Sequence, residues 1–479
     1  MSFFTPEFVF FFLFSFILYY IFKEKRQKYV LFIFSVAFIG LLSVTFLIDV
    51  FLFVLVNYII AIQIEKQKQN PIIKNILYKT GMIFNIGSLF LIKYFNFFLT
   101  TLSHLSSTFN VSFHPEPLKI VVPIGISYYT FQGIGYLIQI NRGNERPEKN
   151  FIILSNYFIF FPKFLSGPIE FSRKLIPQLK HYYSFHYQSI IEGFRLILWG
   201  ALKKMVIADR LAMIIDGVYP QLHSLSGNPL IITFLIQPLH IYFDFSGYTD
   251  IALGIGKIFG IKLTDNFHRP FFSTSVTEFW KRWHISLTSW CNEFIFKRIL
   301  FNRRKWGVWA ASYAVFITFL IIGIWHGPRW TFIVLGILQG IAINYEYFTK
   351  KIRIKVFKRL PNNLNRYLSY FFTYLFMSFS LVFFYAPNLK EALYFLTHLF
   401  YNIDFTGFHL TFVNTSDKII ILLFVVFMFY IEQRQENGKD IFVEINNWPR
   451  MVRRAIYYIL IILIIYLGSP GKEFVYMQF

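Results

Sequence analysis

Long apolar runs, each about as long as a helix that crosses a membrane, recur along most of this chain. Hydrophobic residues make up 56% of its 479 residues, whereas a soluble domain has roughly 45–50%. A helix needs about 20 mostly apolar residues to cross the hydrocarbon core of a bilayer. We therefore expect an all-α polytopic membrane protein with about eleven transmembrane helices, plus re-entrant and interfacial helices around a central tunnel.

Basic segments between the apolar runs predict which helix ends face the cytoplasm. KEKRQK (23–28) and EKQKQNPIIK (65–74) alternate with a nearly uncharged segment rich in Ser, Thr and Asn (99–118), which we expect to be an external loop. This alternation predicts that both termini lie outside the cytoplasm. The net charge of +22 fits cytoplasmic loops and contact with anionic membrane lipid rather than nucleic acid. The start, MSFFTPEFVF, lacks a basic region and carries Glu7, so we expect no cleavable signal peptide.

Three segments interrupt the regular pattern of apolar runs. FPKFLSGPIE (161–170) contains two prolines and a glycine, which fits a re-entrant segment or, alternatively, a kinked helix pair. YFDFSGYTD (242–250) places two acids, a serine and a glycine inside the run 229–260, which predicts an interruption of that helix. Residues 276–290 repeat aromatic and leucine side chains at three- and four-residue spacing, which predicts one amphipathic helix at the membrane interface.

The most informative interruption is GIWHGPRW (323–330). It places His326 at the end of the apolar run 309–326 and follows it at once with a glycine and a proline. Basic segments flank this run and the next one, 330–348, so the turn between them lies either in the membrane interior or at the far surface. An ionisable side chain at membrane depth is costly and marks a functional site. We expect His326 to be a catalytic base inside the membrane.

A second histidine, His284, lies in the tryptophan-rich segment EFWKRWHISL (278–287). Neither His284 nor His326 has a cysteine or another histidine at i+3 or i+4, so we expect no metal site. The chain contains one cysteine, Cys291, which excludes an internal disulfide bond. The two histidines are therefore candidates for acid–base chemistry.

Six short segments, rich in aromatic, proline, glycine and ionisable residues, follow one another through the middle of the chain: VPIGISYYTFQ (122–132), FPKFLSGPIE (161–170), YFDFSGYTD (242–250), DNFHRPF (265–271), EFWKRWHISL (278–287) and GIWHGPRW (323–330). Together they resemble the successive signatures of membrane-bound O-acyltransferases. More closely, they resemble the bacterial branch of alginate and peptidoglycan O-acetyltransferases, to which the teichoic-acid D-alanyl transfer protein is related.

This resemblance implies particular roles for both histidines and for three regions of the chain. His326 of the GxWHG motif corresponds to the catalytic residue, and His284 of the WxRWH motif to the second active-site histidine. Residues 116–348 correspond to the catalytic core. Residues 1–115 supply N-terminal transmembrane helices, and residues 349–479 supply C-terminal helices and an extracytoplasmic tail.

Acyl transfer from a thioester to a hydroxyl needs a base for the hydroxyl proton and hydrogen-bond donors for the oxyanion. A neutral imidazole can accept that proton, and burial keeps an imidazole neutral. We assign His326 as the base and His284 as a positioning group or an oxyanion donor. Other side chains are candidates to orient a histidine, cap a helix or line the tunnel, although each also fits an ordinary packing role. These candidates are Asp244, Asp250, Gln132, Tyr129, Trp325 and Trp283.

Three basic residues are candidates for binding the acyl donor: Arg282, Lys297 and Arg298. Their charge equally fits a signal that keeps this part of the chain in the cytoplasm. We expect acetyl-CoA or an acyl-carrier protein as the donor, and no permanently bound cofactor.

The sequence ends in FVYMQF (474–479), although termini are usually polar. This hexapeptide resembles an aromatic C-terminal signature of several proteins in export-linked acylation systems. We expect it to enter an outer funnel and bring Tyr476 near the catalytic histidine. Tyr476 would then relay the acyl group covalently, or plug or position the site.

The expected function is the transfer of an acyl group, most simply acetyl, across the bacterial cytoplasmic (inner) membrane for O-acetylation of an exported or cell-surface polysaccharide. The resemblance also implies a separate extracytoplasmic polysaccharide acetyltransferase as a partner. Two alternatives remain open at this point. The enzyme alternative is D-alanyl transfer to teichoic acid, and the non-enzyme alternative is a polysaccharide exporter or channel.

Overall fold

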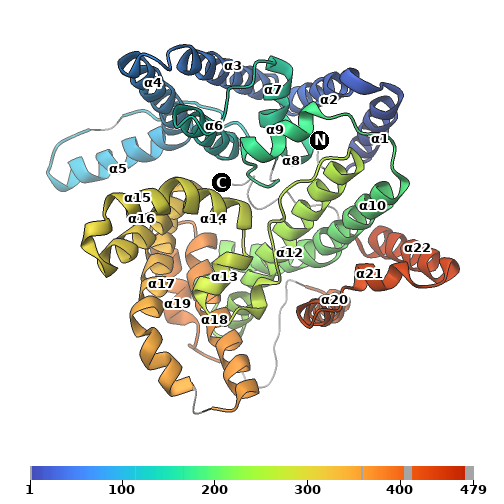
Figure 1. Ribbon diagram of the computed structural model, residues 1–479. Helices are drawn as coiled ribbons and strands as arrows, with labels where there is room; N and C mark the ends of the chain where they lie inside the picture. Colours follow the sequence, from blue (N-terminus) through green and yellow to red (C-terminus); the bar gives the residue numbers. More distant parts are fainter. Residues whose placement is uncertain (1–2, 114, 166, 358–359, 404–412, 470–479) are drawn as a thin grey trace. The chain divides into compact units, whose positions relative to one another are not determined.

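The computed structural model describes residues 3–113, 115–165, 167–357, 360–403 and 413–469 (Figure 1). Within this part of the chain the regular secondary structure is helical, apart from one isolated bridge between Phe267 and Trp283. Tyr476 and the FVYMQF tail lie outside the described residues, so their expected role stays a prediction.

Six of the described helices are long and apolar enough to cross a membrane. The protein is therefore an all-α polytopic membrane protein, as expected. The total of about eleven passes, which also counted shorter apolar runs, stays a prediction. The six candidate spans are Val44–Lys66, Pro71–Thr108, Asn228–Ile258, Val308–His326, Trp330–Val356 and Asn362–Tyr385.

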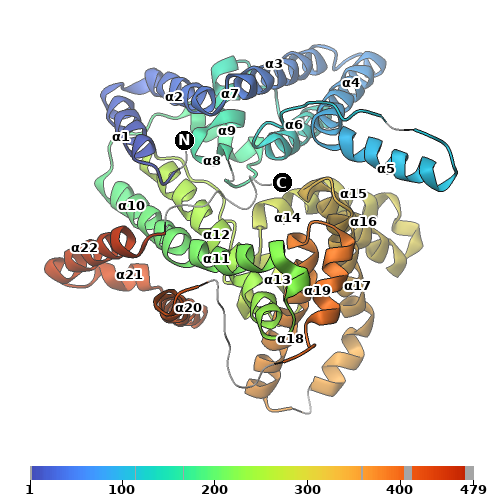
Figure 2. The ribbon, with the colours of Figure 1, turned by 180° about the vertical axis from the view of Figure 1, so that it is seen from behind.

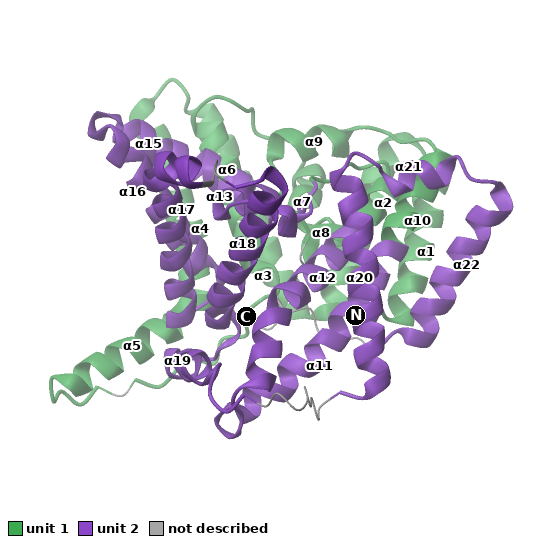
Figure 3. Cartoon of the chain, turned by 90° about the horizontal axis from the view of Figure 1, so that it is seen from below, with its two compact units in different colours: residues 1–197, 251–264 green, residues 198–250, 265–479 purple. Residues whose placement is uncertain are grey.

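The chain divides into two compact units (Figure 3). Unit 1 comprises residues 1–197 and 251–264, and unit 2 comprises residues 198–250 and 265–479. These units are defined by compactness alone. The three functional regions expected from the sequence stay a prediction.

In unit 1, polar caps and prolines set where two of the helices begin. The Thr5 side chain accepts a hydrogen bond from the backbone of Phe8 at the start of α1, and Asn70 caps α4 in the same way. Both helices carry proline at their first position, where a missing N–H costs nothing. The helices that lie wholly or mainly in unit 1 are α1 (Pro6–Ile21), α2 (Gln27–Leu42), α3 (Val44–Lys66), α4 (Pro71–Leu89), α5 (Phe95–Thr108), α6 (Ile126–Asn141), α7 (Phe151–Ile159), α8 (Phe161–Phe164), α9 (Ser172–Lys180) and α10 (Tyr187–Ala201).

The external loop expected at 99–118 is wrong over its first half. A π-helical stretch, Phe90–Tyr94, joins α4 to α5, so that one helical span continues over residues 71–108. Hydroxyl groups along α5 donate back to backbone carbonyls of the preceding turn, as Ser and Thr side chains do inside helices. These hydroxyls belong to Thr100, Ser106, Ser107 and Thr108.

The segment 161–170 contains the break that its prolines and glycine predict. Helix α7 ends where Phe160 leaves the helical conformation (φ −49°, ψ 109°), and α8 has four residues. At 1.5 Å per residue, the nine residues of α7 span about 14 Å, roughly half of the hydrocarbon thickness. Neither helix crosses a bilayer by itself, which favours the re-entrant alternative.

Unit 2 holds the remaining helices, with its C-terminal group coloured red in Figure 2. They are α11 (Asp209–Val218), most of α12 (Asn228–Ile258), α13 (Val276–Arg282), α14 (Ile285–Cys291), α15 (Lys297–Asn302), α16 (Val308–His326), α17 (Trp330–Phe357), α18 (Asn362–Tyr385), α19 (Leu389–His398), α20 (Thr415–Glu436), α21 (Ile441–Asn446) and α22 (Arg450–Leu467).

The interruption expected at 242–250 does not occur, because α12 is continuous through this segment. Its acids are matched by lysines of a π-helix, Leu202–Ala208. Lys204 lies 2.5 Å from Asp244, and Lys203 lies 2.8 Å from Asp250. Paired charges can be buried inside a packed helix, whereas unpaired ones cannot.

A close hairpin of α16 and α17 carries His326 at its turn. A Cβ atom on Gly323 would lie 2.4 Å from the carbonyl oxygen of Phe332, and one on Gly336 would lie 2.5 Å from that of Phe319. Only glycine allows two backbones to approach this closely. The hairpin thereby fixes the end of α16, where His326 is the last helical residue.

Candidate active site

His284 lies at a break between two short helices. The single helix expected over 276–290 is wrong, because α13 ends at Arg282 and α14 begins at Ile285. His284 itself adopts the left-handed conformation (φ 46°, ψ 52°), which is uncommon for a residue other than glycine and concentrates at functional sites. Its side chain is fully buried. The break turns the imidazole away from the direction that a continuous helix would give it.

A neighbouring loop residue, Asn266, holds the His284 ring. Its side-chain oxygen Oδ1 accepts hydrogen bonds from the backbone N–H of Ser286 at 3.1 Å and from the Ser286 hydroxyl at 2.9 Å. The same oxygen lies 3.1 Å from Nδ1 of His284. A backbone N–H can only donate, so the atom that it meets must be the amide oxygen. The neutral imidazole therefore donates from Nδ1 and carries its lone pair at Nε2.

Two physical causes keep His284 neutral. Burial lowers its pKa well below the ordinary value of a histidine, and the nearby His326 lowers it further because two positive charges would repel each other. His284 lies in the connection between α13 and α14, outside the six candidate spans. It is thus neutral at pH 7.

His326 is surrounded by aromatic rings and is 7% exposed. The centre of its ring lies 5.3 Å from that of Trp325 and 5.7 Å from that of Phe384. Trp325 also lies 5.9 Å from the His284 ring. The structure therefore brings together the two histidines of the WxRWH and GxWHG motifs, with Trp325 in contact with both.

A small cavity of about 30 Å³ opens beside His326. This volume is enough for about one water molecule. Its walls include Trp280 of α13, Trp283 directly after that helix, and Gln339 of α17. The Trp280 indole donates to Gln339 at 3.0 Å, and the Gln339 amide donates to Ser380 at 2.9 Å. Apart from His326 and Gln339, the wall is aromatic and aliphatic.

The two acidic candidates take part in ion pairs that hold α12. Asp244 and Asp209 both lie within 2.7 Å of Lys204, and the lysine is 2% exposed. Asp250 contacts Lys203. These contacts place both acids in the helix packing of unit 2. Phe245, also in α12, has its ring centre 4.8 Å from that of His284.

Gln132 and Tyr129 belong to α6 of unit 1. Gln132 accepts a hydrogen bond from Lys163 at 3.0 Å, and Tyr129 donates to Asp49 at 2.5 Å. Burial lowers the pKa of Lys163 to about 7, and Glu170 opposes this shift. Lys163 is a buried polar residue of the FPKFLSGPIE segment that the sequence interpretation passed over.

The donor-binding candidates differ from one another in accessibility. Nη2 of Arg282 donates to Glu278 at 2.6 Å, and Nη1 donates to Glu436 at 3.0 Å. Lys297 and Arg298 are exposed on α15. Arg282 therefore ties α13 to α20, whereas the two α15 residues are accessible to a charged partner.

Sequence reasoning missed two residues of the site, Asn266 and Gln339. Asn266 lies inside DNFHRPF (265–271), a segment already singled out, so its motif carried the signal. Gln339 lies in an otherwise apolar part of α17, and a lone amide in such a stretch marks a polar contact inside the protein. Neither sequence signal indicates which residue the amide contacts.

The chain matches the family described as MBOAT, membrane-bound O-acyltransferase family, over residues 31–386. A peptidoglycan O-acetyltransferase of Helicobacter pylori is 32% identical over 367 residues, which cover 70% of this chain and 67% of that protein. A probable alginate O-acetylase of Pseudomonas putida is 29% identical over 503 residues and covers 100% of both chains. A teichoic acid D-alanyltransferase of Bacillus subtilis is 29% identical over 259 residues, 52% of this chain and 65% of that protein.

Proposed function

This chain belongs to the membrane-bound O-acyltransferase family, and from that premise we propose that it O-acetylates an exported or cell-surface polysaccharide. The relatives that are named for O-acetylation of peptidoglycan and alginate support acetyl as the group and a polysaccharide as the acceptor. The observation that carries the proposal is the buried pair His284 and His326, which share contact with Trp325.

The proposed reaction needs only proton transfer and positioning. An acceptor hydroxyl attacks the thioester carbonyl and gives its proton to His326. The tetrahedral intermediate then collapses, the C–S bond breaks, and the leaving sulfur takes the proton, so that an ester and a free thiol result. His284 presents Nε2 as a second acceptor, which positions the hydroxyl or holds the proton between the two steps.

We place the acyl donor on the cytoplasmic side and the acceptor on the other side of a bacterial cytoplasmic membrane. Basic segments such as residues 297–305 support the first assignment. Acetyl-CoA is the donor we propose, and Lys297 and Arg298 are accessible residues for its phosphates. We also propose that Tyr476 carries the acyl group and that a separate extracytoplasmic transferase is a partner.

Deletion of the gene in its native host, followed by mass analysis of the surface glycan, tests the function. Acetyl groups should disappear from the glycan and return with the wild-type gene. With a gene encoding His326→Ala, the glycan should still be exported but should lack acetyl groups, and with an exposed control, His181→Ala, it should be exported and acetylated. Loss of glycan export on deletion, together with full function of His326→Ala, would favour a transporter. Acetylation that survives would show that the proposed function is wrong.

D-alanyl transfer to teichoic acid is the second candidate, because a relative of that name aligns with half of this chain. The two activities differ in the labelled precursor that reaches the cell envelope. Feeding labelled acetate and labelled D-alanine to the deletion strain and to the complemented strain separates them. Acetate label that depends on the gene supports the first candidate, and D-alanine label supports the second.

A further inference from the structure

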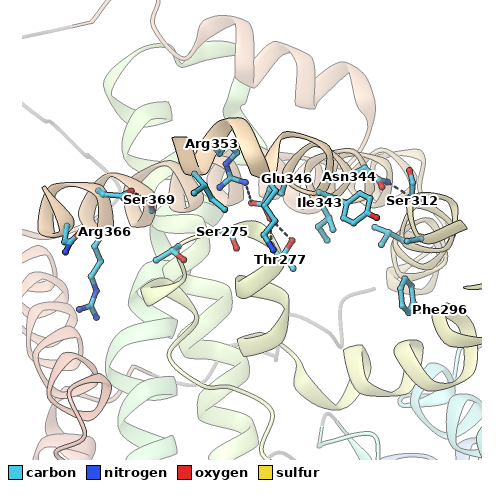
Figure 4. A pocket seen from close by; sticks show the side chains of 18 residues that line it. Ser275, Thr277, Phe296, Ser312, Ile343, Asn344, Glu346, Arg353, Arg366 and Ser369 are labelled. Atoms are coloured by element: carbon cyan, nitrogen blue, oxygen red, sulfur yellow. Dashed lines mark hydrogen bonds and ion pairs between the residues drawn. The ribbon is translucent and has the colours of Figure 1, made fainter. Parts of the chain in front are cut away.

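A cleft of about 760 Å³ opens in unit 2 between α13, α16, α17 and α18. Figure 4 shows the side chains that line it. The cleft lies where α16 and α18 begin and where α17 ends, and all three helices are candidate spans. Its wall is mixed, with aliphatic side chains such as Ile343 and Val315 beside hydroxyl and amide groups. A volume of this size suits a small amphipathic molecule.

Positive charge predominates along the cleft. Lys350 and Arg353 of α17 and Arg366 of α18 line it, and among the described lining residues the one carboxylate is Glu346. Lys350 and Arg366 are exposed. Arg366 is oriented by the hydroxyl of Tyr370 at 2.5 Å. The described lining therefore carries three cations against one anion, which favours a negatively charged occupant.

The single carboxylate already serves another part of the structure. Glu346 accepts hydrogen bonds from the backbone N–H groups of Val276 and Thr277, at 2.6 Å and 2.9 Å, and from the Thr277 hydroxyl at 2.6 Å. Arg353 approaches it only to 4.0 Å. Glu346 is thus hydrogen-bonded to the first turn of α13, whose N-cap is Ser275, and it neutralises little of the charge in the cleft.

Exposed aromatic side chains lie on the helices around the same cleft. Aromatic rings with a polar atom gather at the headgroup level of a bilayer, where one end is apolar and the other is wet. A basic pocket between transmembrane helices at that level is the kind of site that holds a lipid headgroup. The exposed aromatics are Trp306, Trp309, Tyr313, Tyr345, Tyr347 and Tyr367.

We propose that this cleft binds the headgroup of an anionic phospholipid, with the phosphate held by Lys350, Arg353 and Arg366. The glycerol and the upper acyl chains lie against the aliphatic wall and the exposed rings. This occupant accounts for the charge and for the apolar surroundings together, whereas a free phosphate accounts for the charge alone.

The bound lipid would act on the active site through α13. Thr277 and Ser275 line the cleft at the start of this seven-residue helix. Trp280 and Trp283, near its other end, line the cavity beside His326. A headgroup in the cleft therefore holds the helix that forms one wall of the catalytic cavity, and the lipid composition of the membrane can affect that wall.

Native mass spectrometry of the purified full-length protein, with phosphatidylglycerol or phosphatidylcholine added, tests the proposal. The wild type should bind phosphatidylglycerol in preference to phosphatidylcholine. The triple variant Lys350→Gln, Arg353→Gln, Arg366→Gln should bind phosphatidylglycerol on the order of a hundredfold more weakly, from the usual contribution of a basic residue near a lipid surface. A control variant with the same change of charge, Lys23→Gln, Lys25→Gln, Arg26→Gln, should bind like the wild type.

Three outcomes would overturn the proposal. The first is equal binding of phosphatidylglycerol by the triple variant and the wild type. The second is equal loss of binding in the control variant, which would indicate a general charge effect. The third is that the triple variant loses binding of coenzyme A while its lipid binding is unchanged, which would assign the cleft to the acyl donor. If the triple variant fails to fold, the single change Lys350→Glu at an exposed position replaces it in the same binding measurement. Weaker binding of phosphatidylglycerol supports the proposal, and unchanged binding overturns it.

Discussion

Nδ1 of His284 lies 3.1 Å from Oδ1 of Asn266, and this contact determines which nitrogen of the imidazole can accept a proton. The amide oxygen is identified by the Ser286 backbone N–H that donates to it. The lone pair of neutral His284 must therefore lie at Nε2. We therefore propose Asn266 as a positioning residue, which acts on the reaction through His284.

Replacing Asn266 with Ala should lower the rate of acyl transfer about 10- to 100-fold, the usual effect of losing a group that orients a functional histidine. Asn266→Asp offers the same acceptor oxygen and should keep most of the activity. Its carboxylate favours the imidazolium form, so the acid limb of the pH–rate profile should move to higher pH. A pH–rate series with Asn156→Ala, a change at another buried amide, provides the control. Equal profiles for Asn266→Asp and the wild type would contradict this role.

Protonation of His284 should also destabilise the fold at low pH. Its pKa is depressed in the folded state by burial and by His326, so the unfolded chain binds a proton more readily below a pH of about 6.5. Stability should fall with decreasing pH in that range, by up to about 1.4 kcal/mol per pH unit for this one group. Thermal unfolding of the purified protein between pH 5 and 8 measures the slope. His284→Gln should reduce the slope, and the exposed change His181→Gln should not.

Lys204, which pairs with Asp244 of α12, should be among the positions where a substitution lowers the stability most. Lys204→Met leaves Asp209 and Asp244 facing each other without their shared cation, and breaking a buried pair costs about 3–5 kcal/mol. Lys257→Met removes a more exposed pair with Glu192 and should cost less than about 1 kcal/mol. Thermal melts of the two variants compare the costs directly. Similar losses would mean that Lys204 contributes no more than a surface charge.

The hairpin that positions His326 should tolerate no side chain at its crossing point. Gly323→Ala places a methyl group 2.4 Å from the Phe332 carbonyl oxygen, and such overpacking costs about 1–3 kcal/mol. The backbone must move, so acyl transfer should fall as well. Gly87→Ala is the matched control, because a Cβ there meets nothing within 4 Å. A Gly323→Ala protein with wild-type melting and activity would show that the hairpin adapts freely.

The sequence predicted the long helices because their signals are local, and local motifs also singled out the two histidines. Uninterrupted apolar runs define α16, α17 and α18, and tryptophan-flanked motifs define His284 and His326. The continuity of α12 was not predicted, since Asp250 pairs with Lys203 and Asp244 with Lys204, 47 and 40 positions earlier. A lysine that pairs across two helices looks the same in sequence as one that faces water.

The geometry around His284 also could not be predicted. The spacing of its aromatic neighbours fits one continuous helix, and nothing in the sequence marks the left-handed conformation that splits it. That conformation depends on the backbone hydrogen bonds from Ile285 to Asn266 and from His268 to Arg282. These contacts join residues from two separate motifs, so the tautomer of His284 emerges only from the folded chain.

The central claim, that His326 performs acyl transfer, is tested most directly by reconstituting the full-length protein in liposomes. Acetyl-CoA is supplied on the side of the basic loops together with a hydroxyl acceptor, and the release of free thiol and the labelled ester are both measured. The wild type should form thiol and ester in equal amounts, and His326→Ala should be slower by at least about a hundredfold. Equal rates for the wild type and His326→Ala would contradict the account.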